Sequence, residues 1–233
     1  MKVHTANCDF CNEFAGCVEN AFDRIYRHDP NTRVLFRSDE FVVLPSLGQI
    51  AEGHLLVLPI KHWTALGDLT EPLFEEFTEL SKGVTTIVRG EYGSCITFEH
   101  GVRPGSTGGC GIYHAHLHVV PLSATLDPID SLKSKFSYKR IGDLNEIGEL
   151  SQGKSGYLFY QDSHSSAYLF DAPNLTSQYM RRVLADVLGT LNWDWRSAGR
   201  EERLLASLKR LLKRFEAVRV SCASQRTPYV SPR

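Results

Sequence analysis

Hydrophobic positions in the first half of the chain predict a run of short strands around one long amphipathic helix. Apolar residues recur at three- and four-residue steps from Thr70 to about Arg89, a spacing typical of a helix that packs one face. A glycine-rich stretch at 101–109 separates the last two apolar runs. The predicted strands, of which the first three form a β-meander, are 34–36, 41–44, 54–59, 94–99 and 112–122. Residues 1–123 therefore read as one α+β unit.

The second half has a weaker pattern. The composition is more polar from residue 124, so 124–156 is expected to form a loop-rich connecting segment. Residues 157–220 are expected to form a mixed strand and helix extension, and 221–233 a disordered tail. Within the extension, the pattern predicts a hairpin of two strands at 157–160 and 167–170. It also predicts one helix at 178–191 and a second at about 200–218.

Two features of the extension carry an alternative reading. The adjacent Arg181 and Arg182 are interpreted as a solvated helix face, with contact to a phosphate as the alternative. Trp193 and Trp195 are expected to pack against the last helix, with stacking on a base as the alternative.

Composition narrows the class of protein. The 233 residues are 42% hydrophobic and 23% charged, as in ordinary folded proteins. The formal charge of -1 gives no overall attraction to nucleic acid or to an anionic membrane, so neither is an expected partner. No apolar run approaches the roughly 20 residues of a membrane span, and the first residues lack the apolar core of a secretory signal. A cytoplasmic location is therefore expected, with the six cysteines present as thiols or metal ligands.

The segment 114–120 carries the strongest chemical signal, because His114, His116 and His118 alternate with apolar residues. In a strand, a period of two places the three imidazoles on one face and the residues between them toward the core. Aligned imidazoles suit either metal ligation or nucleophilic attack on phosphorus. The nearest acid on the C-terminal side is Asp127, beyond the strand, whereas catalytic metal sites commonly include a carboxylate. A neutral imidazole is a nucleophile near pH 7, so nucleophilic catalysis is favoured.

The alternating histidines follow a Gly53–His62 segment, Gly-His-Leu-Leu-Val-Leu-Pro-Ile-Lys-His, by about 50 residues. With this order and spacing, residues 8 to about 122 resemble the histidine triad (HIT) superfamily of nucleotidyl hydrolases and transferases. The resemblance implies a HIT-like antiparallel sheet with a packing helix in 1–123. It also raises the expectation of a homodimer, since small members of the family pair through their sheets.

The resemblance implies a role for each histidine of the site. His116 would attack the α-phosphorus of a nucleotide, His118 would hydrogen-bond the phosphate oxygens, and His54 would support the triad from the neighbouring strand. The substrate would be a dinucleoside polyphosphate, a nucleotide sugar or a nucleoside phosphoramidate. A nucleotide phosphorylase or transferase, and a nucleotide-binding regulatory protein with little turnover, remain alternatives.

Cys8 and Cys11 form a Cys-x-x-Cys pair ahead of the first strand, a position that favours a metal over a redox pair. Similarity to zinc-containing HIT proteins implies that His62 and His114 complete the site. Four protein ligands leave no open position, so the zinc would be structural and catalysis would need no metal. Other candidate ligands are Cys17, Cys110 and His4. A catalytic metal held by the triad itself, or no metal at all, are the competing hypotheses.

The substrate contacts implied by the resemblance fall where this sequence departs from the family. Ser46 takes the place of the ribose-binding acid or amide, Cys110 and Gly111 precede the triad, and Glu99 lies in the strand before the glycine-rich loop. Distal phosphates could meet side chains or backbone donors of this loop, or the loop could be a flexible surface segment. The candidates on the loop are Arg103, Ser106 and Thr107.

Overall fold

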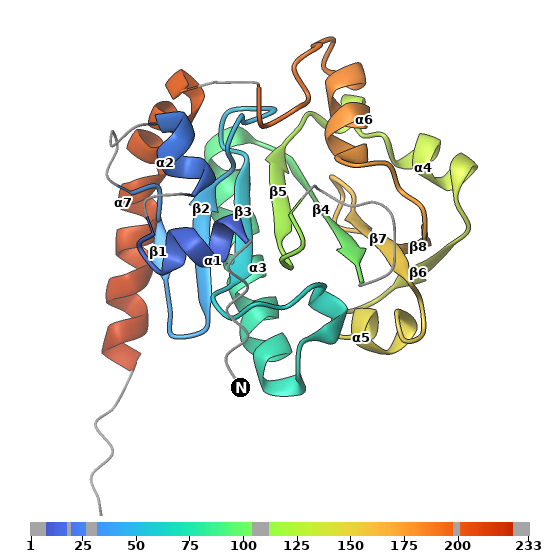
Figure 1. Ribbon diagram of the computed structural model, residues 1–233, viewed down its shortest axis with the longest axis horizontal. Helices are drawn as coiled ribbons and strands as arrows, with labels where there is room; N and C mark the ends of the chain where they lie inside the picture. The colour runs from blue at the N-terminus through green and yellow to red at the C-terminus, as the bar shows by residue number, and fades with distance from the viewer. Residues whose placement is uncertain (1–7, 18–19, 27–31, 104–111, 198–200, 226–233) are drawn as a thin grey trace, which may run out of the picture.

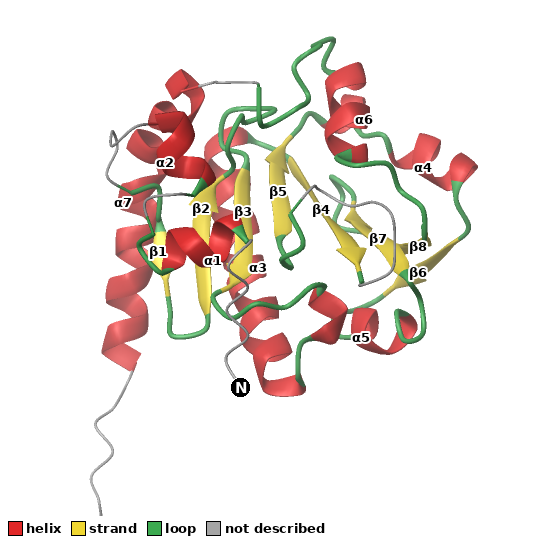
Figure 2. Cartoon of the chain, viewed as in Figure 1, coloured by secondary structure: helices red, strands yellow, loops and turns green. Residues whose placement is uncertain are grey.

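The computed structural model describes residues 8–17, 20–26, 32–103, 112–197 and 201–225. Within these ranges the chain forms one antiparallel eight-stranded sheet with helices on both faces (Figure 1, Figure 2). The strands are β1 (Phe36–Arg37), β2 (Phe41–Pro45), β3 (Leu55–Pro59), β4 (Cys95–Val102), β5 (Leu117–Pro121), β6 (Tyr138–Ile141), β7 (Gly156–Gln161) and β8 (Ala167–Asp171). The α-helices are α1 (Asp9–Phe14), α2 (Ala21–Tyr26), α3 (Glu71–Tyr92), α4 (Ile129–Lys135), α5 (Glu146–Leu150), α6 (Tyr179–Val187) and α7 (Glu201–Gln225). The predicted α+β class is confirmed.

The strand order is β1-β2-β3-β5-β4-β7-β8-β6. The predicted β-meander is confirmed as β1, β2 and β3, and the predicted hairpin as β7 and β8. β7 pairs with β4 from Thr97↔Gln161 to Val102↔Gly156, so the C-terminal extension continues the sheet of the first half. Among the described strands, only β1 and β6 lie at the edges of this sheet. A homodimer that joins two sheets would have to use one of these two strands, and it remains a prediction.

The long helix α3 covers one face of the sheet. Its apolar residues pack against the side chains of β2, β3 and β5 that point to this face, together with α7. The helix ends at Gly93, whose φ of 90° lies in a region that residues with a β-carbon rarely adopt. The prediction of a helix over 70–89 is confirmed. The residues of β5 that share this core are Leu117 and Val119, with Ala115 just before the strand.

The opposite face of the sheet is covered by two groups of helices. α1 lies over β2 and β3, where Phe10 packs with Leu44 and Leu56. α6 and α4 cover β4, β7 and β8, through Met180, Leu184 and Leu132. β5, which begins just after His116, lies between the strands covered by these two groups (Figure 1).

Two expectations for the chain path are corrected by the structure. Residues 124–156 contain α4, β6 and α5 rather than mainly loop; these elements are too short to show a clear hydrophobic period in the sequence. The last helix continues beyond 218 to Gln225, and 226–233 lie outside the described residues. The division into domains at 123 and 156 remains a prediction.

The expected strand over 112–122 begins only at Leu117, so His114 and His116 precede it. Ala115 N–H donates to the Trp63 carbonyl at 2.6 Å, so this part of the backbone bonds to the loop after β3 before the ladder begins. The alternation nevertheless holds, since Ala115, Leu117 and Val119 lie in the core on the α3 face. No described helix is both long and apolar enough to cross a membrane.

Candidate active site and metal cluster

His54, His118 and His116 form a continuous row of imidazoles on the face between α1 and α6. The His54 Nε2 atom lies 2.9 Å from the His118 Nδ1 atom, and the rings of His118 and His116 have centroids 4.8 Å apart. Phe98 on β4 stacks on His118 with a centroid distance of 4.3 Å and an interplanar angle of 14°, which fixes the plane of that ring. The structure therefore brings together the three histidines that the sequence predicts as a group.

Gly53 allows His54 to take this position. Its φ of 82° is a left-handed conformation, and a β-carbon there would lie 2.4 Å from a ring carbon of Tyr92. Any other residue would strain the backbone and collide with this ring. The Gly-His step just before β3 thus has a structural reason independent of any ligand.

The hydrogen bonds assign a proton to one nitrogen of each ring. His116 Nδ1 lies 2.5 Å from the His114 carbonyl oxygen, which only accepts, so Nδ1 carries the proton and Nε2 has the lone pair. The Ile50 N–H donates to His54 Nδ1 at 3.5 Å, so His54 carries its proton on Nε2 and donates it to His118 Nδ1. A neutral His118 then carries its own proton on Nε2.

Burial keeps the rings of His116 and His118 uncharged. It lowers the pKa of His116 to about 4, although the hydrogen bond to the His114 carbonyl acts in the opposite direction. Burial, with the neighbouring imidazoles, holds the pKa of His118 well below its ordinary value. At neutral pH the site therefore offers one imidazole lone pair beside one imidazole N–H.

His116 and His118 line a narrow cleft, in which about 410 Å³ of space free of protein atoms includes the open solvent at its mouth. Ser46 lies in its wall, with its hydroxyl donating to the Leu47 carbonyl at 3.2 Å. The rest of the wall is mainly apolar, with two arginines and one acidic residue, Asp9. The other lining residues are Asp9, Phe10, Ala21, Arg33, Leu47, Leu56, Ile112, Arg181 and Trp195.

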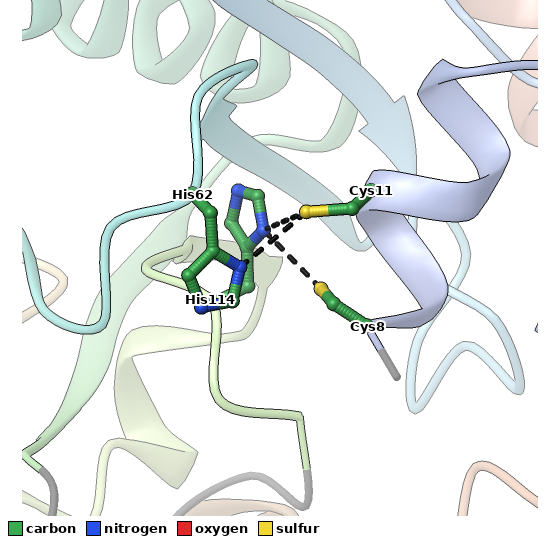
Figure 3. A group of neighbouring side chains, drawn as sticks. All are labelled: Cys8, Cys11, His62 and His114. Atoms are coloured by element: carbon green, nitrogen blue, oxygen red, sulfur yellow. Dashed lines mark hydrogen bonds between the residues drawn. The ribbon is translucent and has the colours of Figure 1, made fainter. Parts of the chain in front are cut away.

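A second group lies beside the first, where Cys8, Cys11, His62 and His114 point toward one another (Figure 3). Their ligand atoms all lie within 4.8 Å of one another. The Sγ atoms of Cys8 and Cys11 lie 3.4 and 3.6 Å from His114 Nδ1, and Cys11 Sγ lies 3.4 Å from His62 Nδ1. In a tetrahedron with Zn–S and Zn–N bonds of usual length, a sulfur and a nitrogen are about 3.6 Å apart. The four residues thus form a cluster that could hold a metal ion.

The surroundings of this cluster also suit a divalent cation. His114 Nε2 donates to the Pro59 carbonyl at 2.8 Å, which leaves Nδ1, the atom facing the cysteines, as the lone-pair nitrogen. Burial raises the pKa of the Cys8 thiol to about 12, so without a cation the thiol stays protonated. A divalent ion with two thiolates and two neutral imidazoles has no net charge, which is the state that a buried site tolerates best.

Phe10 on α1 connects the metal cluster to the histidine row. Its ring centroid lies 5.6 Å from those of both His114 and His116. Because Phe10 lies between the two cysteines in sequence, anything that fixes Cys8 and Cys11 also fixes this wall of the cleft. Of the other candidate ligands, Cys17 is exposed and outside the cluster, while Cys110 and His4 lie outside the described residues.

Two expected substrate contacts do not lie in the cleft. Glu99 is 1% exposed and belongs to the α3 face of the sheet, where it accepts hydrogen bonds from Leu66 N–H at 2.6 Å and the Tyr157 hydroxyl at 2.7 Å. It neighbours Phe98 in β4, and adjacent strand residues point to opposite faces. Arg103 pairs with Asp68 at 2.7 Å, away from the histidines. Cys110, Gly111, Ser106 and Thr107 lie outside the described residues.

The structure places in the cleft wall two residues for which a ligand contact was only the alternative interpretation, Arg181 and Trp195, and one that the sequence pattern did not identify, Arg33. Arg181, read as part of a solvated helix face, is 1% exposed and lines the cleft, whereas its neighbour Arg182 is exposed. Arg33 is equally buried and lines the same cleft. Trp195 also lies in the wall. A short, polar helix start gives no signal in sequence that distinguishes a buried arginine from an exposed one.

Comparisons with known proteins found sequences similar to this chain. The family model described as "Scavenger mRNA decapping enzyme C-term binding" matches residues 19–128. CWF19-like protein 1 of Mus musculus is 26% identical over 187 residues, which cover 72% of this chain and 33% of that protein. The bis(5'-adenosyl)-triphosphatase of Dictyostelium discoideum is 29% identical over 94 residues, 39% of this chain and 60% of that protein.

Among solved structures, a member of the HIT family of proteins from Bacillus subtilis matches with a TM-score of 0.38 and 19% identity, over 49% of this chain and 72% of that one. The chain spans about a third of the length of the CWF19-like relatives that it matches.

Proposed function

The chain belongs to the histidine triad superfamily, and from this premise we propose that it is a nucleotidyl hydrolase with His116 as its nucleophile. The observation that carries the proposal is the hydrogen bond from His116 Nδ1–H to the His114 carbonyl oxygen. It directs the lone pair of the ring to Nε2, on a side chain that lines the cleft. The substrate is a nucleoside 5′-phosphoryl compound, such as a dinucleoside polyphosphate, a nucleotide sugar or a nucleoside phosphoramidate.

The first step forms a bond between His116 Nε2 and the α-phosphorus, while the bond from phosphorus to the leaving group breaks. The leaving group departs with the electron pair of that bond and takes up a proton from solvent. Water then attacks the phosphorus, the nitrogen–phosphorus bond breaks, and the nucleoside monophosphate leaves with the oxygen of that water. Nε2 regains its lone pair and the proton of the water passes to solvent.

His118 and His54 support this step through their tautomers. The Ile50 N–H donates to His54 Nδ1, and His54 Nε2–H donates to His118 Nδ1, so a neutral His118 carries its proton on Nε2. That N–H donates to a non-bridging oxygen, where negative charge develops in the transition state. His54 is fully buried and is absent from the cleft wall, so it is a positioning residue. Ser46 is proposed to contact the ribose.

The four-residue metal cluster is proposed to hold a structural zinc ion. Its ligands would be Cys8, Cys11, His62 and His114, whose donor atoms and spacing suit tetrahedral zinc. When bound, the ion would hold α1 against the segment that carries His116. The chemistry of the phosphoryl group is assigned to the histidines of the cleft.

Intact-mass spectrometry of the protein mixed with each substrate class tests the proposal. We expect wild type to gain the mass of one nucleotidyl group and the His116→Ala and His116→Gly variants to gain none. His164→Ala, in the exposed turn between β7 and β8, serves as the matched control and keeps the adduct. Nucleotide binding without adduct or turnover in wild type would contradict the enzyme and favour a regulatory protein. Faster turnover with phosphate, with a nucleoside diphosphate as product, would favour a phosphorylase.

A further inference from the structure

Arg181 brings a buried positive charge to the cleft from the C-terminal extension. It lies in the first turns of α6 and is 1% exposed. It lines the same cleft as His116 and His118, and its charge contributes to the low pKa of His118 after burial and the neighbouring histidines. A guanidinium loses much hydration when it is buried, so such a group is kept where it meets polar or anionic partners.

The guanidinium is held in place by backbone oxygens from two segments. Its Nε–H donates to the Trp193 carbonyl at 2.7 Å, and one terminal nitrogen donates to the Gly48 carbonyl at 2.5 Å. The neighbouring Met180 N–H donates to His100 Nε2 at 3.2 Å, which anchors the start of α6 to β4. The orientation of Arg181 is therefore fixed by the sheet and by the loop between β2 and β3.

The second arginine of the cleft has a different environment. Arg33 makes two hydrogen bonds to the Glu13 carboxylate, at 2.8 and 2.6 Å, which match its charge. Arg181 donates to two backbone carbonyls, and Asp194 is close enough to feel its charge, a carboxylate that also accepts hydrogen bonds from the Gln178 side chain and from Arg196 N–H. The charge of Arg181 also reaches the ring of His118, which lines the same cleft. This places the guanidinium within electrostatic range of an anion at the histidines.

We propose that Arg181 binds the phosphoryl group held between His116 and His118, so that the extension supplies the cation of the phosphate site. This inference rests on the proposed function, because it takes the cleft of His116 as the place where a phosphoryl group binds. Guanidinium groups bind phosphate oxygens through charge-assisted hydrogen bonds. It follows that the extension selects ligands with an anionic phosphoryl group over the corresponding nucleosides.

Titration calorimetry with the four common nucleoside monophosphates and their nucleosides tests this inference without turnover. We expect wild type to bind the preferred monophosphate at least about 10-fold more tightly than its nucleoside, as a charge-assisted contact provides. Arg181→Met should lose most of this ratio while binding the nucleoside as wild type does. Arg181→Lys should keep part of the ratio, and Arg182→Met, at the exposed neighbour, should keep all of it.

Thermal unfolding of each variant, followed by circular dichroism, separates binding from folding. If Arg181→Met unfolds early, Arg181→Ala with added guanidinium ion provides the second measurement, and recovery of monophosphate affinity supports the inference. An unchanged ratio in folded Arg181→Met, no recovery with guanidinium, or no monophosphate binding by wild type would each overturn it. Because these measurements use reversible ligands, a missing His116 adduct refutes only the proposed hydrolysis.

Discussion

Replacement of Arg33 by methionine should strongly destabilise the protein. The guanidinium is 1% exposed, makes two hydrogen bonds to Glu13 and a third, at 2.6 Å, to the Pro45 carbonyl, and lies 5.6 Å from the ring centroid of Phe22. Its loss leaves the Glu13 carboxylate, 11% exposed, without its counter-charge. Breaking a buried pair in this way costs about 3–5 kcal/mol. For a chain of this size the melting temperature should fall by roughly 6–20 °C.

Urea unfolding and thermal melts of Arg33→Met, compared with two further variants, measure this effect. Arg24→Met breaks the exposed pair with Asp9, where Arg24 is 57% exposed, and should cost at most about 1 kcal/mol. The double variant Arg33→Met with Glu13→Leu removes both charges and should recover part of the loss. A cost for Arg33→Met no larger than for Arg24→Met would refute the view that this pair holds α1 and the cleft wall in place.

Two further predictions concern the metal cluster and the pH dependence of stability. Chelation, or Cys11→Ser, should lower the melting temperature and expose α1 to proteolysis, while it slows formation of the His116 adduct only indirectly. Metal analysis, limited proteolysis and the mass of the adduct check this prediction. Complete loss of the adduct with α1 still protected would instead favour a catalytic metal. Burial raises the pKa of Glu99 from 4.5 to about 8. Between pH 4.5 and pH 8, the Glu99 carboxyl is therefore protonated in the folded state and ionised in the unfolded chain. The free energy of unfolding should therefore fall as pH rises from about 5 to 8, by up to about 1.4 kcal/mol per pH unit, and level off above pH 8. Glu99→Gln should flatten this slope in urea titrations at pH 5, 6.5 and 8, and an unchanged slope would place the titrating group elsewhere.

Several parts of the fold follow from local pattern alone. The period of three to four residues over 70–89 and the alternation at 114–120 record which side of each element meets the core. Both patterns hold in the structure even where the hydrogen bonding differs, as at His116, which precedes β5. The four residues Cys8, Cys11, His62 and His114 were also named from the sequence, because their spacing matched a known family, and the structure brings them together.

Other parts depended on which elements lie side by side. Glu99 was expected at the substrate, yet the side on which a strand residue points is fixed by register, and Phe98↔His118 places Phe98 rather than Glu99 beside the histidines. The glycine that follows His100 permits a close approach, since a β-carbon at Gly101 would lie 2.0 Å from the Tyr157 ring. This packing brings the Tyr157 hydroxyl to Glu99 and gives the carboxyl a structural place.

By itself the sequence predicted the face of each main element, because this depends on spacing along a few neighbouring residues. It also predicted which histidines and cysteines lie together, because their order along the chain resembles that of a known family. Only the tertiary structure decided that Arg181 and Arg33 are buried at the cleft and that β7 extends the sheet at β4. Burial of a charge is a property of the elements packed around it, and those come from positions more than 100 residues apart, as with Arg181 and Gly48. No local pattern of polar and apolar residues contains that information.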